Sequence, residues 1–584
     1  MLNLMKVASL GIIFFLMCTI SLVGQSKFTE SGLEEILLGD YDPQDFYDDL
    51  SKTPKDLIVT NLNQEMSSDY LKSYLLDMMA FKTRNSGSDT IGNNGIGAAR
   101  DYALQKFIEF SEEEGSHIIP SFFEFERTIC EVTRHKNICA IQPGVGDDPS
   151  IIVIEAHLDS RCSSVCDIEC DAHGMEDNAS GSALVLELAR IMGKNTYEHT
   201  IVYMLTIGEE QGLVGADAFS EYCVDTGIEV KAVFNNDIVG GIICGETSSG
   251  PSCPGEGHVD SLQVRLFSHG AESRQLSRWI KEQYKEELQG LVQVPMLLSI
   301  MSLEDRQGRG GDHIPFREDG FLAMRFTSAN EHGNANAADP DYHDRQHTSD
   351  DILGMDTNLD GELDSFFVDF NYLGRNAVIN GTSASLAANG PDQVTFDGFI
   401  DGDSLLIEIN DDNNIGSYRV YSRSSTSQDL DTSYVVSNGN SRHIVKNPGS
   451  NFAQFISVSS MDDEGIESIL SPENFINTVL SDGVAIQIEQ PKEKLLTLLQ
   501  NRPNPFDEAT SIGYVVHHRI PSSNNLEVVI RDLNGVEIHR MEGPKNEGYN
   551  EVVYNHGFNK SGTFIYTVEI DKRPIASKTM IFAY

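Results

Sequence analysis

The spacing of hydrophobic residues changes along the chain and separates several kinds of segment. Between residues 30 and 115, apolar positions recur every three or four residues, as they do in 69–79, which predicts amphipathic helices. From residue 150 onward, short apolar runs alternate with helical stretches. These runs predict strands buried on both faces, with one helix between the first two: strands at 151–154, 201–207, 230–234 and 320–326, helix at 180–192. This order of elements indicates an α/β sheet.

After about residue 385 the helical spacing disappears. Short alternating stretches, such as 404–409, 417–421 and 453–458, are separated by Asp, Asn and Gly turns and predict a small β-sandwich. A β-rich block also closes the chain. We therefore expect four segments after residue 24: a first unit at 25–384, a β-sandwich at 385–480, a linker at 481–498 and a final block at 499–584.

The first 24 residues have the pattern of a secretory signal peptide. Lys6 supplies a positive charge, residues 7–23 form an apolar run, and Gly24 ends a stretch of small residues. A membrane anchor needs about 20 apolar residues, and this shorter run is interrupted by polar ones. Lipoprotein processing at Cys18 is an alternative, but the small residues expected before a lipidated cysteine are missing. The pattern favours export without a transmembrane anchor.

Eight cysteines remain once Cys18 leaves with the signal, and all of them precede residue 260: Cys130, Cys139, Cys162, Cys166, Cys170, Cys223, Cys244 and Cys253. An even number in an exported chain favours disulfides. The even spacing of Cys162, Cys166 and Cys170 is also compatible with a metal site. Disulfides or buried thiols are the better interpretation, because an oxidising compartment removes free thiolates; the sequence does not give the pairing.

The charge balance excludes two classes of partner. The 584 residues contain 89 acidic and 42 basic side chains, for a formal net charge of −47. Nucleic-acid binding requires clustered Lys and Arg, so this balance argues against it and against an anionic membrane surface. Hydrophobic residues make up 40% of the chain, which favours a folded protein over a disordered one.

Chemically reactive residues follow three of the predicted strands, and another precedes the predicted helix. Ligands bind beyond the carboxyl ends of strands in an open α/β sheet, so these side chains should meet at one edge. Each alone is more often a cap or a solvated loop residue, but several carboxylates in one crevice repel each other without a cation. The set therefore predicts a metal site built from His157, Asp159, Asp177, Glu209, Glu210 and Asp237.

The order of these residues resembles that of a known family, the secreted two-zinc aminopeptidases. Their superfamily also contains glutamate carboxypeptidases and glutaminyl cyclases, and the resemblance covers about residues 65–380. It rests on six motifs: His157-x-Asp159, residues 177–181, Glu209-Glu210 before Gly212, Asn236-Asp237, residues 312–316 and residues 347–351. The resemblance implies a zinc exopeptidase-like fold, with a mixed, mostly parallel central sheet and helices on both faces.

The resemblance also implies a role for each residue of the site. Two Zn²⁺ ions would be held by His157, Asp177, Glu210, Asp237 and His347. Asp177 would bridge the ions, which a carboxylate can do at a metal spacing of about 3.5–4 Å. Glu209 would act as general base, and Asp159 would fix the tautomer of His157.

Two further histidines and one acidic loop lie near these motifs. His343 competes with His347 as the last ligand, and we favour His347 because the sequence His-Thr-x-x-Asp follows directly. His313, next to Asp312, is expected to support the ligands rather than to bind metal. A calcium loop is a weaker candidate: residues 356–364 match the start of an EF-type loop, but Phe367 stands where the loop requires Glu. A solvated turn is the better interpretation there.

The C-terminal part resembles two kinds of module. Residues 390–480 are similar to a fibronectin type III-like sandwich, mainly over 457–468. The final block resembles the C-terminal sorting domain of the type IX secretion system in Bacteroidetes-like bacteria, at residues 501–506, 531–535 and 561–566. That resemblance implies passage across the outer membrane by the type IX machinery, followed by release or attachment at the cell surface. The alternative is one more β-sandwich.

These features favour an exported two-zinc aminopeptidase that acts on the N-termini of peptides or proteins. Glutaminyl cyclisation on the same fold is an alternative, but the Glu209-Glu210 pair is typical of the aminopeptidases. Carboxypeptidase action stays open because the residues that would choose the peptide end cannot be placed from the sequence. A non-catalytic surface adhesin is disfavoured, because the candidate ligands and base are all present.

Overall fold

The computed structural model describes residues 26–243, 259–305, 310–329, 345–477 and 495–582, with short gaps in the last two ranges. The expected signal at 1–24, Cys244, Cys253 and His343 lie outside these residues. The helices are α1 (Leu33–Leu37), α2 (Lys55–Glu65), α3 (Ser68–Met79), α4 (Gly95–Ser111), α5 (Ser180–Met192), α6 (Val214–Thr226), α7 (Gly270–Gln283), α8 (His313–Glu318) and α9 (Phe370–Asn389), with short helical turns η1 (Pro43–Asp45), η2 (Met175–Ala179) and η3 (Tyr284–Leu288).

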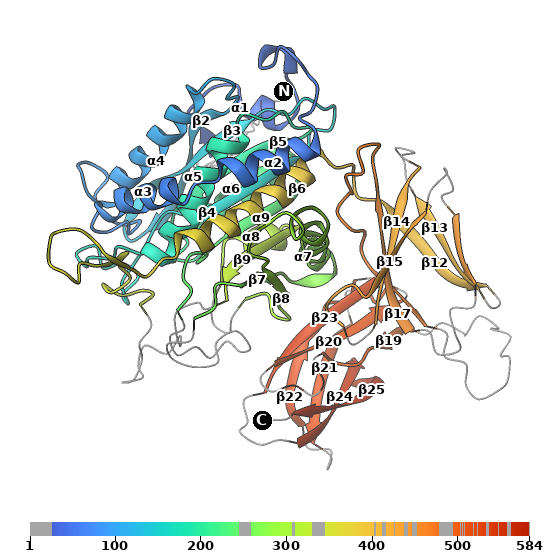
Figure 1. Cartoon of the computed structure of the whole chain (residues 1–584). Helices are drawn as coiled ribbons and strands as arrows, with labels where there is room; N and C mark the ends of the chain where they lie inside the picture. Colours follow the sequence, from blue (N-terminus) through green and yellow to red (C-terminus); the bar gives the residue numbers. More distant parts are fainter. Residues whose placement is uncertain are drawn as a thin grey trace, which may run out of the picture.

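A nine-stranded sheet forms the centre of the first unit. Its strands are β1 (Lys27–Phe28), β2 (Ile119–Ile129), β3 (Val132–Gln142), β4 (Ile151–His157), β5 (Thr200–Thr206), β6 (Val230–Asn236), β7 (Gln263–Phe267), β8 (Leu297–Ile300) and β9 (Ala323–Ser328). They follow the order β1-β2-β3-β5-β4-β6-β9-β7-β8 (Figure 1). The central strands β5, β4, β6 and β9 are parallel, and antiparallel pairings flank them. The expected mixed sheet is confirmed.

The chain reverses its direction of travel across the sheet at β4. From β4 it passes through α5 to β5 on one side, and from β5 through α6 to β6 on the other side of β4. Because such crossovers are right-handed, α5 and α6 cover opposite faces of the sheet. Ligands bind where the strand order reverses in this way. The topology therefore places a binding crevice beyond the carboxyl ends of β4, β5 and β6.

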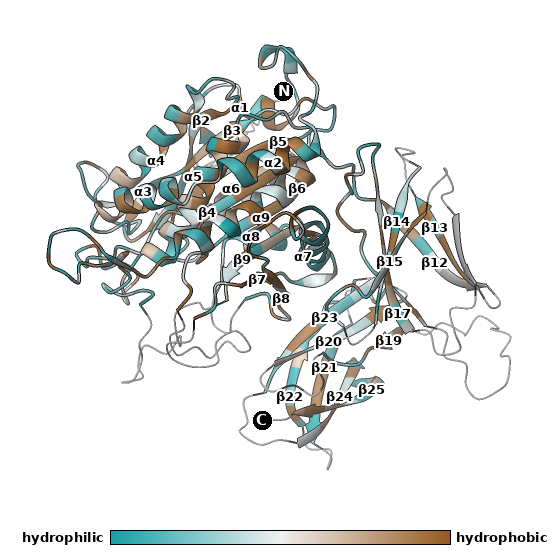
Figure 2. Ribbon diagram, viewed as in Figure 1, coloured by the Kyte–Doolittle hydropathy of each residue, from teal (hydrophilic) through white to brown (hydrophobic). Residues whose placement is uncertain are grey.

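Burial explains why these strands could be predicted from apolar runs. Every residue of β4 and of β5 is buried, and α5 is buried along its whole length between the sheet and α9. Hydrophobic colours accordingly gather on the central strands (Figure 2). The helical segment expected at 30–115 contains α1 to α4. Among the described residues, no helix is both long and apolar enough to cross a bilayer.

Two pairs of smaller sheets follow α9. The strands of the first pair are β12 (Thr395–Asp401), β13 (Ser404–Asn410) and β16 (Arg442–Lys446), facing β14 (Tyr418–Ser424), β15 (Thr432–Val436), β17 (Ala453–Ser460) and β18 (Asn474–Asn477). Side chains from both sheets, such as Ile407 and Val458, share one core. A two-stranded ribbon of β10 (Gly354–Met355) and β11 (Ser365–Phe366) precedes α9.

The last block has the same two-layer arrangement. Its strands are β19 (Leu496–Leu498), β20 (Ala509–Val516) and β23 (Gly548–Asn555), facing β21 (Leu526–Asp532), β22 (Glu537–Glu542), β24 (Gly562–Ile570) and β25 (Arg573–Phe582). The linker predicted at 481–498 is too long at its end, because β19 pairs with β20 and buries Leu496 and Leu498 in this core. The resemblances to a fibronectin type III module and to a sorting domain stay predictions.

Helix α7 lies on the side of the first unit that faces the sandwiches (Figure 1), and its side chains contact both of them. Arg274 makes a buried ion pair of 2.8 Å with Glu551 of the last block. One helical turn further along, Arg278 pairs with Glu473 of the first sandwich at 3.2 Å. Charged groups are rarely buried unless they are paired in this way, so both contacts are specific features of the interface.

Candidate metal centre

The predicted site residues converge at the crevice beyond the central strands. His157 is the last residue of β4, and Asp237 follows β6 directly. Glu209 and Glu210 lie in the turn between β5 and α6. Asp177 lies in η2, the irregular turn that leads into α5. His347 lies in the loop before β10, near the C-terminal end of the first unit in sequence.

The first group of side chains contains His157, Glu209 and Asp237. Their potential ligand atoms lie within 4.8 Å of one another. The Nε2 atom of His157 is 3.3 Å from Oδ1 of Asp237 and 3.9 Å from Oε2 of Glu209. His157 and Asp237 are buried, so the group lies at the bottom of the crevice.

The second group contains Asp177, Glu210 and His347 within the same 4.8 Å limit. The Nε2 atom of His347 is 3.1 Å from Oδ2 of Asp177 and 3.2 Å from Oε2 of Glu210. Asp177 also contacts the first group, because its Oδ1 lies 3.2 Å from Nε2 of His157. Each oxygen of this one carboxylate therefore faces a different histidine.

The donor atoms suit a zinc centre. Imidazole nitrogen and carboxylate oxygen are ordinary zinc ligands, and both groups offer them from several directions. Oε1 of Glu210 is buried and has no hydrogen-bond partner, although such atoms are normally satisfied. The carboxylates of Asp177, Glu209, Glu210 and Asp237 all line one cavity of about 330 Å³. A bound cation would give Oε1 of Glu210 a partner, and it would offset the negative charge of the four carboxylates.

The titration behaviour of the site shows how strongly it attracts positive charge. Burial alone would lower the pKa of His157, yet the carboxylates of Glu209 and Asp237 raise it well above its ordinary value. Glu210 and Asp177 likewise raise the pKa of His347 to about 9 against the effect of burial. Burial and the neighbouring carboxylates raise the pKa of Glu209 well above its usual range. A metal ion bound here would compete with these protons.

Asp159 supports the site by more contacts than we expected. The Nδ1 atom of His157 lies 3.1 Å from the backbone carbonyl oxygen of Asp159, and 3.6 Å from its carboxylate. The carboxylate itself accepts hydrogen bonds from the backbone N–H groups of Glu209 and Glu210 and from the hydroxyl of Ser86. Asp159 thus orients the imidazole mainly through its backbone and positions the Glu209-Glu210 turn through its side chain.

Asp312 and His313 lie behind the ligands. The carboxylate of Asp312 accepts a hydrogen bond from the hydroxyl of Thr206, and burial raises its pKa to about 7. The Nε2 atom of His313 is 3.2 Å from the carbonyl oxygen of Glu304. Burial and the charge of Arg325 lower the pKa of His313 to about 3. Neither residue belongs to a metal-binding group among the described residues, and their supporting role stays a prediction.

Three functional contacts were not predicted from the sequence. Asp351 accepts hydrogen bonds from the backbone N–H groups of Glu176 and Asp177, at 2.9 and 3.0 Å, and so fixes η2. Arg325 pairs with Oδ2 of Asp237 at 3.1 Å. Arg161 pairs with Oε2 of Glu210 at 2.7 Å. Only Asp351 lay within a motif that we had singled out, and no local pattern marked the two arginines.

A third group that could hold a metal consists of Asp148, His199 and Asp392, at the opposite edge of the sheet. Here a cation is already present within the chain, because Nζ of Lys231 lies 2.6 Å from Nε2 of His199. The predicted calcium loop has no such group among the described residues. Its Asp356 and Asp364 instead accept hydrogen bonds from backbone N–H groups of the loop, as in a solvated turn.

Comparisons with known proteins match the part of the chain that contains these residues. The model of Peptidase family M28 matches residues 137–358. A probable zinc metalloprotease of Leptosphaeria maculans is 30% identical over 394 residues, covering 62% of this chain and 85% of its own length. The chain belongs to peptidase family M28. Another relative in sequence, a probable zinc metalloprotease of Pyricularia oryzae, is 30% identical over 359 residues, or 56% of this chain and 66% of that protein.

Solved structures that are similar to part of this chain include an aminopeptidase and a cyclase. The LapA aminopeptidase of Legionella pneumophila is 19% identical, with a TM-score of 0.41 over 59% of this chain and 78% of that one. The glutaminyl cyclase of Porphyromonas gingivalis is 15% identical, with a TM-score of 0.36 over 55% and 97% of the two chains. The family matches confirm the zinc metallopeptidase that the motifs predicted. The sequence relatives reported above are fungal proteins, and they do not bear on the two C-terminal resemblances.

Proposed function

We propose that this M28 metallopeptidase is an exported aminopeptidase that holds two zinc ions and removes N-terminal residues from peptides. The observation that carries the proposal is the position of Asp177, whose two carboxylate oxygens each face one histidine-containing group. His157 and Asp237 would hold one ion, Glu210 and His347 the other, and Asp177 both. When bound, the ions would lower the pKa of a water molecule and polarise the scissile carbonyl.

Glu209 is the residue placed to move the proton. It lies in the cavity beside His157, and Asp159 fixes its backbone N–H. Its carboxylate would take a proton from the attacking water and return it to the leaving amine.

The cavity favours action at a peptide terminus. Its volume of about 330 Å³ is near the lower limit for ligand pockets, so it suits one terminal residue better than an extended chain. Of the four carboxylates that line it, Glu209 is the one not assigned to zinc, and it can accept a hydrogen bond from the α-amino group of a substrate. Together these features support release of N-terminal residues.

Export is the second part of the proposal. The segment around the site contains two disulfides, Cys130–Cys166 and Cys162–Cys170, and disulfides of this kind persist in oxidising compartments. Cys139 and Cys223 are buried free thiols. The signal-like N-terminus and the sorting-domain resemblance of the last block support passage through the type IX machinery, with the protein secreted or attached at the cell surface.

The test compares hydrolysis of aminoacyl-nitroanilides by the purified chain with and without a chelator. Glu209→Gln should lower kcat by about 10²–10⁴-fold, the usual contribution of a general base. Zinc content, measured on the same samples, should stay at two ions per chain. Glu221→Gln is the matched control, since Glu221 is an exposed residue of α6 away from the cavity. Full activity of Glu209→Gln, or activity indifferent to metal removal, would refute the mechanism.

A further inference from the structure

The cavity contains a guanidinium group that the proposed reaction does not use. Arg161 lines it, and its Nε donates to Oε2 of Glu210 at 2.7 Å. Its Nη1 donates to the carbonyl oxygens of Cys162 and Ser163, at 3.2 and 3.5 Å. Its Nη2 lies 2.8 Å from Nδ1 of His347. Arg161 therefore contacts the two residues proposed to complete the second zinc site.

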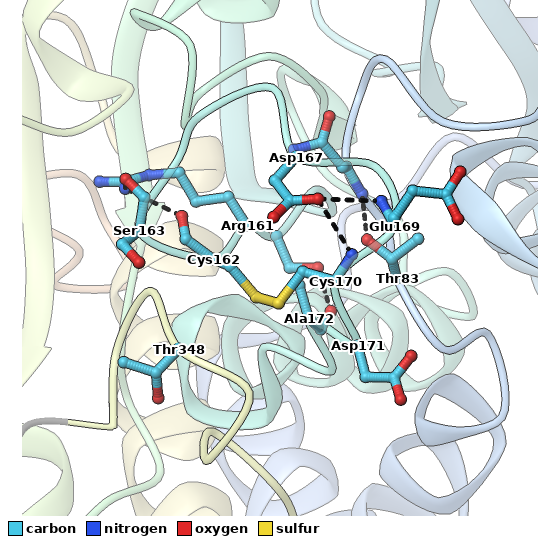
Figure 3. The surroundings of a disulfide bond; sticks show 12 residues. Thr83, Arg161, Cys162, Ser163, Asp167, Glu169, Cys170, Asp171, Ala172 and Thr348 are labelled. Atoms are coloured by element: carbon cyan, nitrogen blue, oxygen red, sulfur yellow. Dashed lines mark hydrogen bonds between the residues drawn. A yellow bond between two sulfur atoms is a disulfide. The ribbon is translucent and has the colours of Figure 1, made fainter.

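Two disulfides hold the segment that presents Arg161. Cys162, its neighbour in the chain, is bonded to Cys170, as Figure 3 shows. Cys166, within the same loop, is bonded to Cys130 in the turn between β2 and β3. A loop fixed at both its ends and its middle loses little conformational entropy when a ligand binds. Arg161 can therefore contact a substrate without a large entropic cost for ordering its loop.

The contact between Arg161 and His347 depends on which nitrogen carries the proton. Nδ1 of His347 accepts a hydrogen bond from Nη2 only while Nδ1 has no proton of its own. Nε2 faces Asp177 and Glu210, so Nε2 is the atom directed at a metal. An imidazole that binds metal through Nε2 carries its proton on Nδ1. In the zinc-loaded protein Nη2 therefore needs a different acceptor.

The balance of charge in the cavity points to an anionic acceptor. Two dications would offset the four carboxylates of Asp177, Glu209, Glu210 and Asp237 that line it. Two arginines line the same cavity, but Arg325 is engaged with Asp237 and with Asp305 outside it. Arg161 then contributes the positive charge that remains at the opening. A guanidinium binds a carboxylate well, because its N–H groups match the two oxygens.

We propose that Arg161 is a specificity-determining residue that binds a carboxylate of the substrate close to the scissile amide. The proposal rests on the proposed peptidase function and adds a substrate class to it. The carboxylate has two possible sources: an acidic side chain on the N-terminal residue, or the C-terminal carboxylate of a dipeptide. Both present the same chemical group to Arg161, and substrates can distinguish them.

The test uses pairs of substrates that differ only in the charge of one group. Aspartyl-nitroanilide against asparaginyl-nitroanilide tests the side chain, and Leu-Gly against Leu-Gly-amide tests the C-terminus. In the wild-type protein we expect kcat/KM to favour the carboxylate in one pair by about tenfold to a hundredfold, the range of one charge-assisted hydrogen bond. Arg161→Met should bring that ratio close to one, and Arg161→Lys should retain part of it.

The ratio within each pair is independent of zinc content and of folding, because both substrates meet the same protein sample. Arg127→Met is the matched control, since Arg127 pairs with Glu221 at the surface; its ratio should equal that of the wild type. Equal ratios in the wild type and in Arg161→Met would overturn the proposal. So would a wild-type ratio near one in both pairs.

A binding measurement separates this proposal from the peptidase activity itself. Calorimetry on Glu209→Gln should show that zinc-loaded protein binds the preferred carboxylate compound more tightly than its amide counterpart, and that Arg161→Met in the same background removes the difference. Chelated protein should also lack it, because without the ions the four carboxylates that line the cavity repel an anion. If neither the wild type nor any variant hydrolyses an N-terminal residue, the proposed peptidase function fails. If the zinc-loaded protein binds the carboxylate compound and its amide counterpart equally well, the proposed role of Arg161 fails, whatever the outcome for hydrolysis.

Discussion

Asp351 provides a sharp test of how the chain positions the bridging carboxylate. Its side chain is buried, and its two oxygens accept hydrogen bonds from the backbone N–H groups of Glu176 and Asp177 at 2.9 and 3.0 Å. Asp351→Asn keeps the shape of the side chain but replaces one oxygen with an NH₂ group. That group faces an N–H donor, so one of the two bonds is lost and η2 is less firmly held.

Zinc affinity is the quantity to measure. Partners that orient metal ligands typically contribute about 10–100-fold to metal affinity, which is about 1.4–2.7 kcal/mol, and we expect a loss in this range. The free energy of unfolding is a poorer measure. Burial raises the pKa of Asp351 to about 7, so its ionised form costs stability above that pH, and Asn removes this cost while it loses a hydrogen bond.

The assay is a zinc titration against a competing chelator at pH 8, where the Asp351 carboxylate is charged. Asp350→Asn is the matched control, because Asp350 is the neighbouring residue and is exposed. We expect Asp350→Asn to bind zinc as the wild type does. If Asp351→Asn binds both ions as tightly as Asp350→Asn, the backbone of η2 does not position Asp177 and this reasoning is wrong.

Two further predictions concern the fold around the site. Arg274→Met leaves Glu551 buried without its arginine partner, and urea unfolding should show that docking of the last block weakens by about 3–5 kcal/mol. Lys281→Met is the control at the more exposed pair with Asp429, and it should cost at most about 1 kcal/mol. Equal effects of the two substitutions would contradict the buried-pair interpretation. Burial and Lys231 lower the pKa of His199 to about 3, so the folded state resists a proton that the unfolded chain accepts below about pH 6.5. Stability should therefore fall toward pH 3 by up to about 1.4 kcal/mol per pH unit, and His199→Gln should flatten this slope in urea unfolding at pH 6.5 and 5; an unchanged slope would contradict the assignment.

The sequence was most informative where strands are buried on both faces. Residues 180–192 were predicted as a helix and form α5, and the apolar runs at 151–154 and 230–234 lie in β4 and β6. In such positions every side chain is buried, so the strand appears in the sequence as an uninterrupted apolar run. The same holds for the predicted stretches at 404–409 and 453–458, which lie in β13 and β17.

The hairpin of β2 and β3 was missed for a physical reason. It lies on the antiparallel side of the large sheet, and only alternate residues of β2 are buried. Glu124 and Glu126 occupy the more exposed positions and pair with Lys136 and Arg134 of the neighbouring strand. This alternation interrupts the apolar run that identified the central strands. Antiparallel strands with one solvent-exposed face commonly show such an alternation of apolar and polar residues.

The two halves of the metal centre differ in how the sequence specifies them. His157, Glu209 and Asp237 follow parallel strands, and the fold alone brings the ends of such strands together. The other half depends on a loop residue, His347, and on side chains that meet only in the folded chain. No spacing along the sequence records those meetings, since they join segments nearly 200 residues apart: |i−j| is 186 between Arg161 and His347. The resemblance to a family could therefore supply His347, whereas Arg161 required the structure. This difference explains why Arg161 is harder to predict than His157 and Asp237: the sheet determines where its strands end, whereas contacts between loops form only in the folded chain.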